Sequence, residues 1–269
     1  MESSSLVERE ADHPRSGPGA SRRRLIDTHC HLDLYPDVPA AIRDVDAAGV
    51  YTIAVTNTPS VFRPLVALAR GASRVRVALG LHPELAARRA AELPLFRELL
   101  PDTRYVGEVG LDYVTADAAD RAVQRRVLDA ILSWCDADGT KVLTLHSRRA
   151  ADDVVDAVGP QFRGRWILHW YSGSRRTLDR ALANGAYVSA NAAMLRSAKG
   201  RALLAAVPLE RVLTETDGPF VQSAAGMPAR PTDVAEVAAA MASLWQLSQE
   251  VAEAKIATAF RALLGDGAP

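Results

Sequence analysis

The sequence predicts an α/β fold, a closed (β/α)₈ barrel of the TIM type, and three observations support this prediction. Eight short apolar runs alternate with segments of helical spacing. The chain has 269 residues, of which 48% are hydrophobic, enough for the core of a barrel of about 250 residues. Polar side chains of the kinds that bind metal ions follow most of the apolar runs.

The apolar runs have the length of buried strands. Buried strands that alternate with helices are typical of βαβ units and a parallel sheet. Eight such units within about 245 residues fit a closed barrel better than a doubly wound sheet. The expected strands span residues 25–26, 51–55, 75–79, 105–106, 142–145, 166–168, 186–188 and 212–213.

Two of the helical segments carry especially clear signals. Apolar residues recur at helical spacing over residues 123–135 and again over residues 234–245, where the segment Pro231-Thr232-Asp233 provides a helix start. Residues 1–24 are rich in Ser, Pro, Gly and charge and lack any apolar period. We therefore expect a disordered leader over residues 1–24 and one barrel domain over residues 25–269.

Composition limits the partners and the compartment. The 32 basic and 32 acidic residues cancel, so no global charge attracts the protein to nucleic acid or to a membrane surface. No run approaches the ~18 consecutive apolar residues that a membrane span needs. The two cysteines, Cys30 and Cys135, form no CxxC motif. These features predict a cytoplasmic protein without a membrane partner.

The histidines are concentrated after the apolar runs. Five of the six lie at the C-terminal end of an expected strand. Taken singly, each could be an ordinary hydrogen-bonded residue, but the C-terminal strand ends of a parallel barrel converge on one small patch. Buried polar groups there need partners, which a metal cluster supplies. The candidate ligands are His29, His31, Glu108, His146, His169 and Asp217.

The candidate ligands suit two divalent ions. His29 and His31 are two residues apart, so on a continuing strand both face the same side. A set of nitrogen and oxygen donors without thiolate favours Zn²⁺, Mn²⁺ or Mg²⁺ over a structural zinc site. We expect one ion on His29, His31, Glu108 and Asp217, and a second on His146, His169 and the bridging Glu108.

Such a pair of ions has a defined chemistry. Two ions ~3.5–4 Å apart can activate a water and stabilise both the attacking and the leaving oxygen of an in-line phosphoryl displacement. Asp217 is the best candidate to orient that water and take its proton. Asp217 and Glu108 are therefore the expected catalytic residues.

At these residues the sequence resembles the TatD-type metal-dependent deoxyribonucleases of the amidohydrolase superfamily. The resemblance runs in family order from residue 25 to about residue 264. The matching segments are DTHCHL (27–32), GLHP (80–83), GEVGLD (107–112), HSR (146–148), HWYSGS (169–174) and TETDGPF (214–220).

The resemblance implies a TIM barrel with two divalent ions that hydrolyses phosphodiester bonds of DNA, often as an exonuclease. The family's metal positions carry over to the six candidate ligands named above. His82 matches a family histidine that contacts substrate or the groups around the metal ligands. Arg148 matches a position suited to a phosphate oxygen, which a guanidinium can bind in bidentate fashion.

Two segments depart from the usual family pattern. Residues 221–231 replace an Arg-Gly-rich stretch with an Asn-x-Pro motif, and Trp170-Tyr171 replaces a Cys-Phe pair. Both variations resemble the TatD-like subgroup of Qat-type antiphage cassettes, which implies work beside other cassette proteins on foreign or damaged DNA. Trp170 and Tyr171 could stack on unpaired bases, at about 1–3 kcal/mol per contact, or pack against the barrel rim.

Two alternatives remain at this point. A small-molecule amidohydrolase or lactonase could use the same barrel, but many such enzymes carry a carbamylated lysine at the end of the fourth strand. Glu108 holds that position here, and Lys141 lies at the start of the fifth strand. A non-catalytic DNA-binding or scaffold subunit would be expected to have lost ligands, and none of the six is missing.

Overall fold

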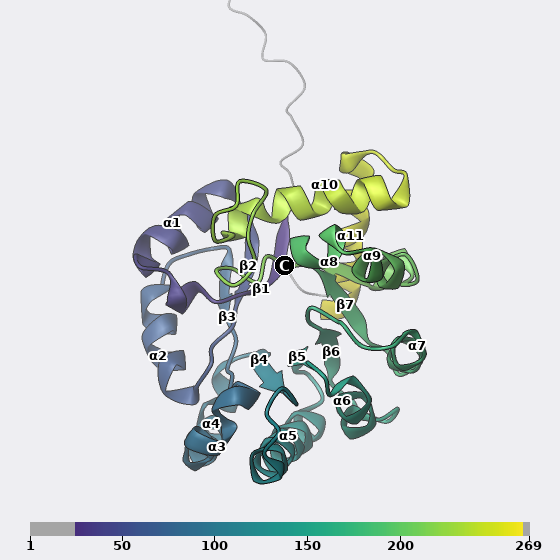
Figure 1. Ribbon diagram of the computed structural model, residues 1–269. Coiled ribbons are helices and arrows are strands. Elements are labelled where there is room, and N and C mark those ends of the chain that lie inside the picture. The colour runs from purple at the N-terminus through teal and green to yellow at the C-terminus, as the bar shows by residue number, and fades with distance from the viewer. Residues whose placement is uncertain (1–24, 266–269) are drawn as a thin grey trace, which may run out of the picture.

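A ring of parallel strands lies inside a ring of helices in the computed structural model, which describes residues 25–265 (Figure 1). The predicted leader, residues 1–24, lies outside the described residues. The strands are β1 (Ile26–Cys30), β2 (Tyr51–Ala54), β3 (Val75–Val77), β4 (Tyr105–Gly110), β5 (Val142–His146), β6 (Arg165–Leu168), β7 (Tyr187–Ala190) and β8 (Val212–Thr214).

The eight expected strands are confirmed, and β1 and β4 extend furthest beyond their apolar runs. β1 continues through His29, and β4 continues through Glu108 to Gly110. Every residue of both strands is buried. The apolar runs are shorter than the strands because polar side chains that contact one another fill the barrel interior at the C-terminal ends of these strands.

The strands are joined in chain order around the ring, with two seams. Parallel ladders connect β1-β2-β3 and β4-β5-β6-β7-β8. A bridge between Leu79 and Val106 joins the chain beyond β3 to β4. At the other seam, Thr28 Oγ1 donates to Thr214 O at 3.0 Å, and Thr214 Oγ1 donates to Ile26 O at 2.6 Å. Two threonine hydroxyls thus take the place of ladder bonds where β8 meets β1.

Helices cover the outside of the barrel, as Figure 1 shows. The expected helices over residues 123–135 and 234–245 are confirmed within α5 and α10, and α10 follows a 3₁₀ turn at Pro231–Asp233. No helix among residues 25–265 is both long enough and apolar enough to cross a bilayer. The helices are α1 (Val38–Ala48), α2 (Pro59–Leu68), α3 (Ala86–Arg89), α4 (Leu93–Leu99), α5 (Ala118–Asp138), α6 (Ala151–Val158), α7 (Arg175–Ala183), α8 (Ala192–Arg196), α9 (Ala198–Leu204), α10 (Val234–Trp245) and α11 (Gln249–Leu264).

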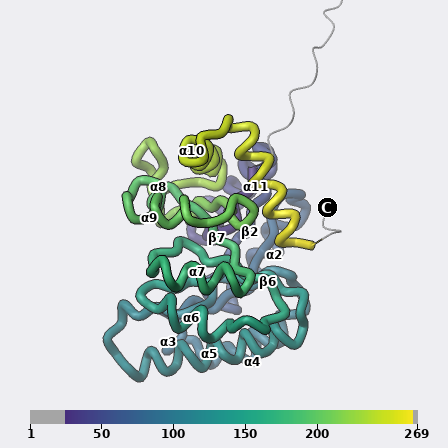
Figure 2. Tube along the Cα trace, turned by 90° about the vertical axis from the view of Figure 1, so that its right-hand side faces the viewer, coloured from purple at the N-terminus to yellow at the C-terminus, as the bar shows by residue number. Residues whose placement is uncertain are grey.

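The core has two parts. One lies between the strands and the surrounding helices. The other joins inward residues of the strands, such as Ile26, Ile167 and Leu213, to Phe260 and Leu263 of α11. Figure 2 shows α11 running along one end of the barrel. Because α11 packs on the N-terminal ends of the strands, the barrel interior is accessible from the C-terminal ends, where the predicted site lies.

The seam between β8 and β1 predicts a stability effect. Thr214→Val keeps the shape of the side chain but leaves the buried Ile26 carbonyl without its hydroxyl donor, so we expect a loss of about 1–3 kcal/mol in the free energy of unfolding. Urea titration followed by circular dichroism measures it. Thr258→Val, on the exposed face of α11, is the control and should change stability by less than about 0.5 kcal/mol. Equal effects of the two substitutions would contradict this account of the seam.

Candidate active site

A cavity of about 540 Å³ opens at the C-terminal ends of the strands. Ligand sites of enzymes typically measure about 300–1,000 Å³, and those of TIM barrels lie at this face. Its lining includes the candidate ligands His31, Glu108, His169 and Asp217. The predicted convergence of residues that lie far apart in the sequence is therefore realised in one place.

Three donor atoms, from His29, His31 and Glu108, face one another at the first cluster, and Asp217 lies beside the two histidines. His29 Nε2 and His31 Nε2 are 3.4 Å apart and lie 3.4 and 3.3 Å from Glu108 Oε2. The same two nitrogens lie 3.8 and 3.6 Å from Asp217 Oδ1. Ligand atoms at the corners of a tetrahedron around Zn²⁺ are about 3.4 Å apart, given bonds of about 2.1 Å. The spacing of these atoms fits a divalent cation.

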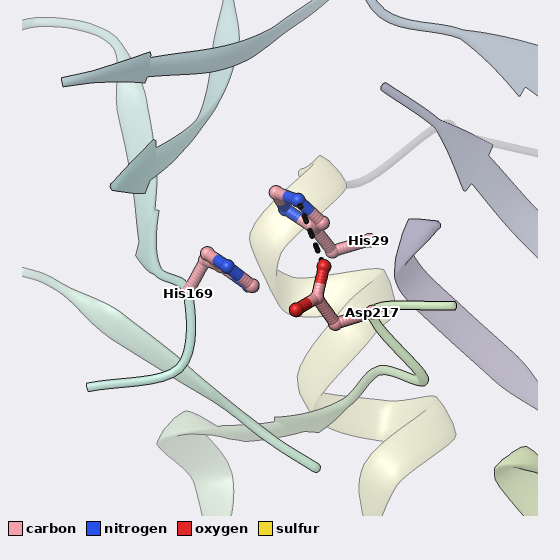
Figure 3. Close-up of side chains that lie close together, drawn as sticks. All are labelled: His29, His169 and Asp217. Atoms are coloured by element: carbon pink, nitrogen blue, oxygen red, sulfur yellow. Dashed lines mark ion pairs between the residues drawn. The ribbon is translucent and has the colours of Figure 1, made fainter. Parts of the chain in front are cut away.

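Asp217 is held against β1 by the backbone. Its amide donates to His29 O at 2.9 Å, and its φ is 48°. Figure 3 shows its carboxylate directed at His29, and the ring of His169 is stacked on that of His29, with the centroids 3.7 Å apart. Among the described residues, the buried Oδ1 atom of Asp217 has no hydrogen-bond partner. An unpaired buried carboxylate oxygen is costly, so this atom also fits a bound cation.

Glu108 faces a second set of nitrogens with its other oxygen. Glu108 Oε1 lies 2.5 Å from His146 Nδ1 and 3.4 Å from His82 Nε2. His169 Nε2 lies 3.7 Å from the same oxygen. The Glu108 side chain is only 2% exposed, so it lies between two groups of imidazoles rather than in water. His82 is thus placed where it could hold an ion together with Glu108 and His146.

Two glycines allow the strands to approach one another at the site. A Cβ on Gly80 would lie 1.8 Å from Thr56 O and 2.5 Å from the amide nitrogen of Glu108. A Cβ on Gly110 would lie 2.0 Å from His146 O, and the φ of Gly110 is 145°. Any other residue at these positions would displace Glu108 or His146.

In three of the histidines, the ring nitrogen that does not face the cluster contacts a neighbouring side chain, which fixes the orientation of the ring. Thr144 Oγ1 lies 2.7 Å from His29 Nδ1, and Asp112 Oδ2 lies 2.7 Å from His146 Nε2. Glu215 Oε2 lies 2.9 Å from His169 Nδ1. Sequence reasoning missed these three supporting residues. Asp112 and Glu215 lie within the motifs, but their residue types do not distinguish a ligand from a residue that orients one.

The electrostatics of the site follow from the burial of several carboxylates among several imidazoles. Burial opposes ionisation of Glu108, but His82, His146 and His29 outweigh it and hold the pKa of this carboxyl well below its ordinary value. Burial also opposes the charged form of His146, yet Glu108 and Asp112 raise its pKa to about 10. Burial and the neighbouring His169 lower the pKa of His29 to about 3. The cluster therefore cannot protonate all its imidazoles, which leaves His29 a neutral nitrogen donor.

The residues expected to contact substrate are in different environments. Arg148 is exposed and lines the cavity, as does Trp170, which is 38% exposed. Tyr171 differs from the expectation: its ring is 1% exposed, it packs in the core, and its hydroxyl donates to Ser174 O at 2.7 Å. It packs in the core because the chain turns after β6 at Trp170, whose φ is 38°.

Phe220 also lines the cavity, although the sequence did not predict it as a site residue. Its side chain is 60% exposed, and its ring lies edge-on to His31, with the centroids 5.0 Å apart. It lines the same cavity as Trp170. Its exposure comes from the turn after Asp217, which no period in the sequence indicates.

The fold and the site together define a class: metal-dependent hydrolases built on a TIM barrel. The model of the family described as TatD related DNase matches residues 26–265, and the chain belongs to this family. Its sequence is 31% identical over 246 residues to YjjV of Escherichia coli K12, named an uncharacterized metal-dependent hydrolase, across 86% of this chain and 94% of the relative.

A solved structure and a second relative agree with this assignment. The crystal structure of the TatD homolog YjjV from Escherichia coli K12 matches with a TM-score of 0.81 and 27% identity, over 90% of this chain and 98% of that chain. A protein of Edwardsiella piscicida named 3'-5' ssDNA/RNA exonuclease TatD is 34% identical over 153 residues, covering 53% of this chain and 57% of its own length.

Metal binding at this cluster predicts a measurable stabilisation. Adding Mn²⁺ to metal-stripped protein should raise its free energy of unfolding, by about 2.7 kcal/mol at 100 times the dissociation constant. Glu108→Gln removes the anion shared by both nitrogen sets and should lose most of this gain. Differential scanning calorimetry with and without Mn²⁺ measures the shift. Glu253→Gln, a buried glutamate of α11, should keep the wild-type shift. An unchanged shift in Glu108→Gln would refute the assignment.

Proposed function

We propose that this protein hydrolyses phosphodiester bonds of DNA from a chain end, using a water activated between two divalent ions. The observation that carries the proposal is the position of Glu108. Its Oε2 faces His29 and His31, while its Oε1 faces His146, His82 and His169. A carboxylate shared in this way suits two neighbouring cations.

The distances from the two Glu108 oxygens to the histidine nitrogens support a two-ion ligand assignment. One ion would be held by His29, His31, Glu108 and Asp217, and the second by Glu108, His146 and His169, with His82 beside it. Bound Zn²⁺, Mn²⁺ or Mg²⁺ would lower the pKa of a water and offset charge on the phosphoryl oxygens. Asp217 then orients the attacking water and accepts its proton, because its buried carboxylate reaches the cluster from the loop after β8.

The cavity wall supplies contacts for a nucleotide chain. The exposed guanidinium of Arg148 is positioned to bind a phosphate oxygen. Trp170 and Phe220 present partly exposed aromatic rings to the same space, and aromatic rings stack on unpaired bases without regard to sequence. Since the net charge of the chain is zero, this local set would have to hold the polyanion.

The relatives support the same reaction class. The exonuclease name of the Edwardsiella relative fits cleavage from an end of a single strand, with Phe220 and Trp170 receiving the terminal bases. A role in antiphage defence beside other cassette proteins stays a prediction from residues 170–171 and 221–231. In the structure, part of that loop forms a bridge between Gln222 and Pro228.

The small-molecule amidohydrolase alternative receives no support from the lysine that such enzymes use. Lys141 Nζ donates to Leu100 O and Thr103 O, both at 2.8 Å, at the N-terminal end of β5. The bridging position at the other end of the barrel is filled by Glu108. We therefore propose carboxylate-bridged phosphodiester hydrolysis.

The catalytic assignment predicts a large loss of activity in two variants. Purified protein with Mg²⁺, Mn²⁺ or Zn²⁺ should shorten end-labelled DNA, and Glu108→Ala or Asp217→Ala should slow this by at least about 10²–10⁴-fold. Gel analysis of single- and double-stranded substrates measures the rates. Glu253→Ala is the control and should keep wild-type activity. Absence of metal-dependent cleavage of any DNA would overturn the proposed function, and cleavage by both variants would overturn the residue roles.

The position of Trp170 and Phe220 on the cavity wall predicts that their substitution changes KM rather than kcat. Phe220→Ala or Trp170→Ala should raise KM for single-stranded DNA by about 5- to 150-fold, since one base stack contributes about 1–3 kcal/mol. Phe220→Leu keeps apolar surface but lacks a flat ring, so it should not restore KM. Leu68→Ala, an exposed residue of α2, is the control. A wild-type KM in the Phe220 variants would exclude stacking at this position.

A further inference from the structure

Glu215 is a fully buried acid that the proposed reaction does not use. It follows β8 and is 0% exposed. Four donors surround its carboxylate. Oε2 accepts from His169 Nδ1 at 2.9 Å and from Ser189 Oγ, and Oε1 accepts from the amide of Trp170 at 3.1 Å and from Asn191 Nδ2 at 2.9 Å. The carboxylate thus connects the ends of β6, β7 and β8.

The contact with His169 decides which ring nitrogen faces the cavity. The four donors around the Glu215 carboxylate make it an acceptor, so the Nδ1 atom of His169 carries the proton of their hydrogen bond. When the ring is neutral, its lone pair is therefore on Nε2, the atom that lies 3.7 Å from Glu108 Oε1. Glu215 therefore fixes both the ring orientation and the tautomer that a cation requires.

The contact with Trp170 holds an unusual backbone conformation. The φ of Trp170 is 38°, in the left-handed region that large side chains rarely adopt. Such a conformation persists only where the surroundings impose it. The bond from the Trp170 amide to Glu215 Oε1 does so, and the turn places the indole on the cavity wall.

We propose that Glu215 is a positioning residue that holds two functional parts of the cavity with one carboxylate: the imidazole of His169 and the backbone that carries the Trp170 indole. This proposal rests on the proposed function only for the role of the cavity. The way in which Glu215 holds His169 and Trp170 does not depend on that function. Metal binding by His169 and the position of Trp170 on the cavity wall would then both depend on Glu215.

A glutamine cannot replace this carboxylate, although it has the same shape. If its oxygen faces the Trp170 amide, its NH₂ group faces His169 Nδ1, and the imidazole must move its proton to Nε2. If the amide is reversed, the Trp170 N–H loses its acceptor. Asn191 cannot turn to compensate, because its Oδ1 accepts from the amide of Met194 at 3.0 Å. One of the two parts is therefore released in either orientation.

The test uses Mn²⁺ alone and the fluorescence of Trp170. Isothermal titration of metal-stripped full-length protein should show Mn²⁺ affinity about 10- to 100-fold weaker in Glu215→Gln than in wild type. The emission of Trp170, obtained as the difference from the same protein carrying Trp170→Phe, should shift its maximum in Glu215→Gln. Glu253→Gln makes the same chemical change at a buried site on α11 and should leave both readouts at wild-type values.

Glu215→Asp is the second variant, because it keeps an acceptor-only anion but draws it back by one methylene. It should weaken Mn²⁺ binding and shift the Trp170 emission in the same direction. If a variant of Glu215 with a wild-type circular dichroism spectrum retains either the wild-type Mn²⁺ affinity or the wild-type Trp170 emission, the proposal is overturned. Neither readout involves nucleic acid, so failure of the protein to cleave DNA would contradict the proposed function alone.

Discussion

The interaction on which the site depends is the burial of one carboxylate, that of Glu108, among imidazoles from several strands. Removing a carboxylate from water costs several kcal/mol unless partners compensate. Glu108 obtains its partners from β1, from the chain after β3, from β5 and from the chain after β6. No pair of neighbouring strands could supply them, so the set depends on the arrangement of the strands in a ring.

The same requirement explains why the site is supported so extensively. A histidine that binds a cation has to be held at one ring orientation. The side chain that holds it comes from a different strand than the histidine itself. Thr144 on β5 orients His29 on β1, and Glu215 after β8 orients His169 after β6. Two residues at the cavity, Trp170 and Asp217, have positive φ values of 38° and 48°. Strained backbone that hydrogen bonds hold in place is common at functional sites.

Much of the architecture could be predicted from the sequence, because strands that alternate with helices leave a strong periodic signal. The position of five histidines after apolar runs was enough to indicate convergence, since parallel strands in a barrel end at one face. The strand ends were harder: β1 and β4 continue through polar residues because those residues are buried together. The threonine seam between β8 and β1 could not be predicted, because it depends on the register of strands that lie 186 residues apart.

The finer features of the site depend on orientation, which residue types do not reveal. Trp170 and Tyr171 are adjacent in the sequence, yet one lines the cavity and the other packs in the core. Glu215 and Asp217 are both acidic and two residues apart, yet Glu215 turns toward β7 while Asp217 turns toward β1. These differences arise from the turns after β6 and β8, whose positive φ values no sequence period encodes.

The most direct test of the account is a crystal structure of the protein soaked in Mn²⁺, with anomalous difference maps that locate the ions. We expect two peaks about 3.5–4 Å apart, one on each side of the Glu108 carboxylate. One peak next to His29 and His31 and the other next to His146 and His169 would match the two nitrogen sets. Ions bound elsewhere, with the Glu108 carboxylate bound to none of them, would contradict it.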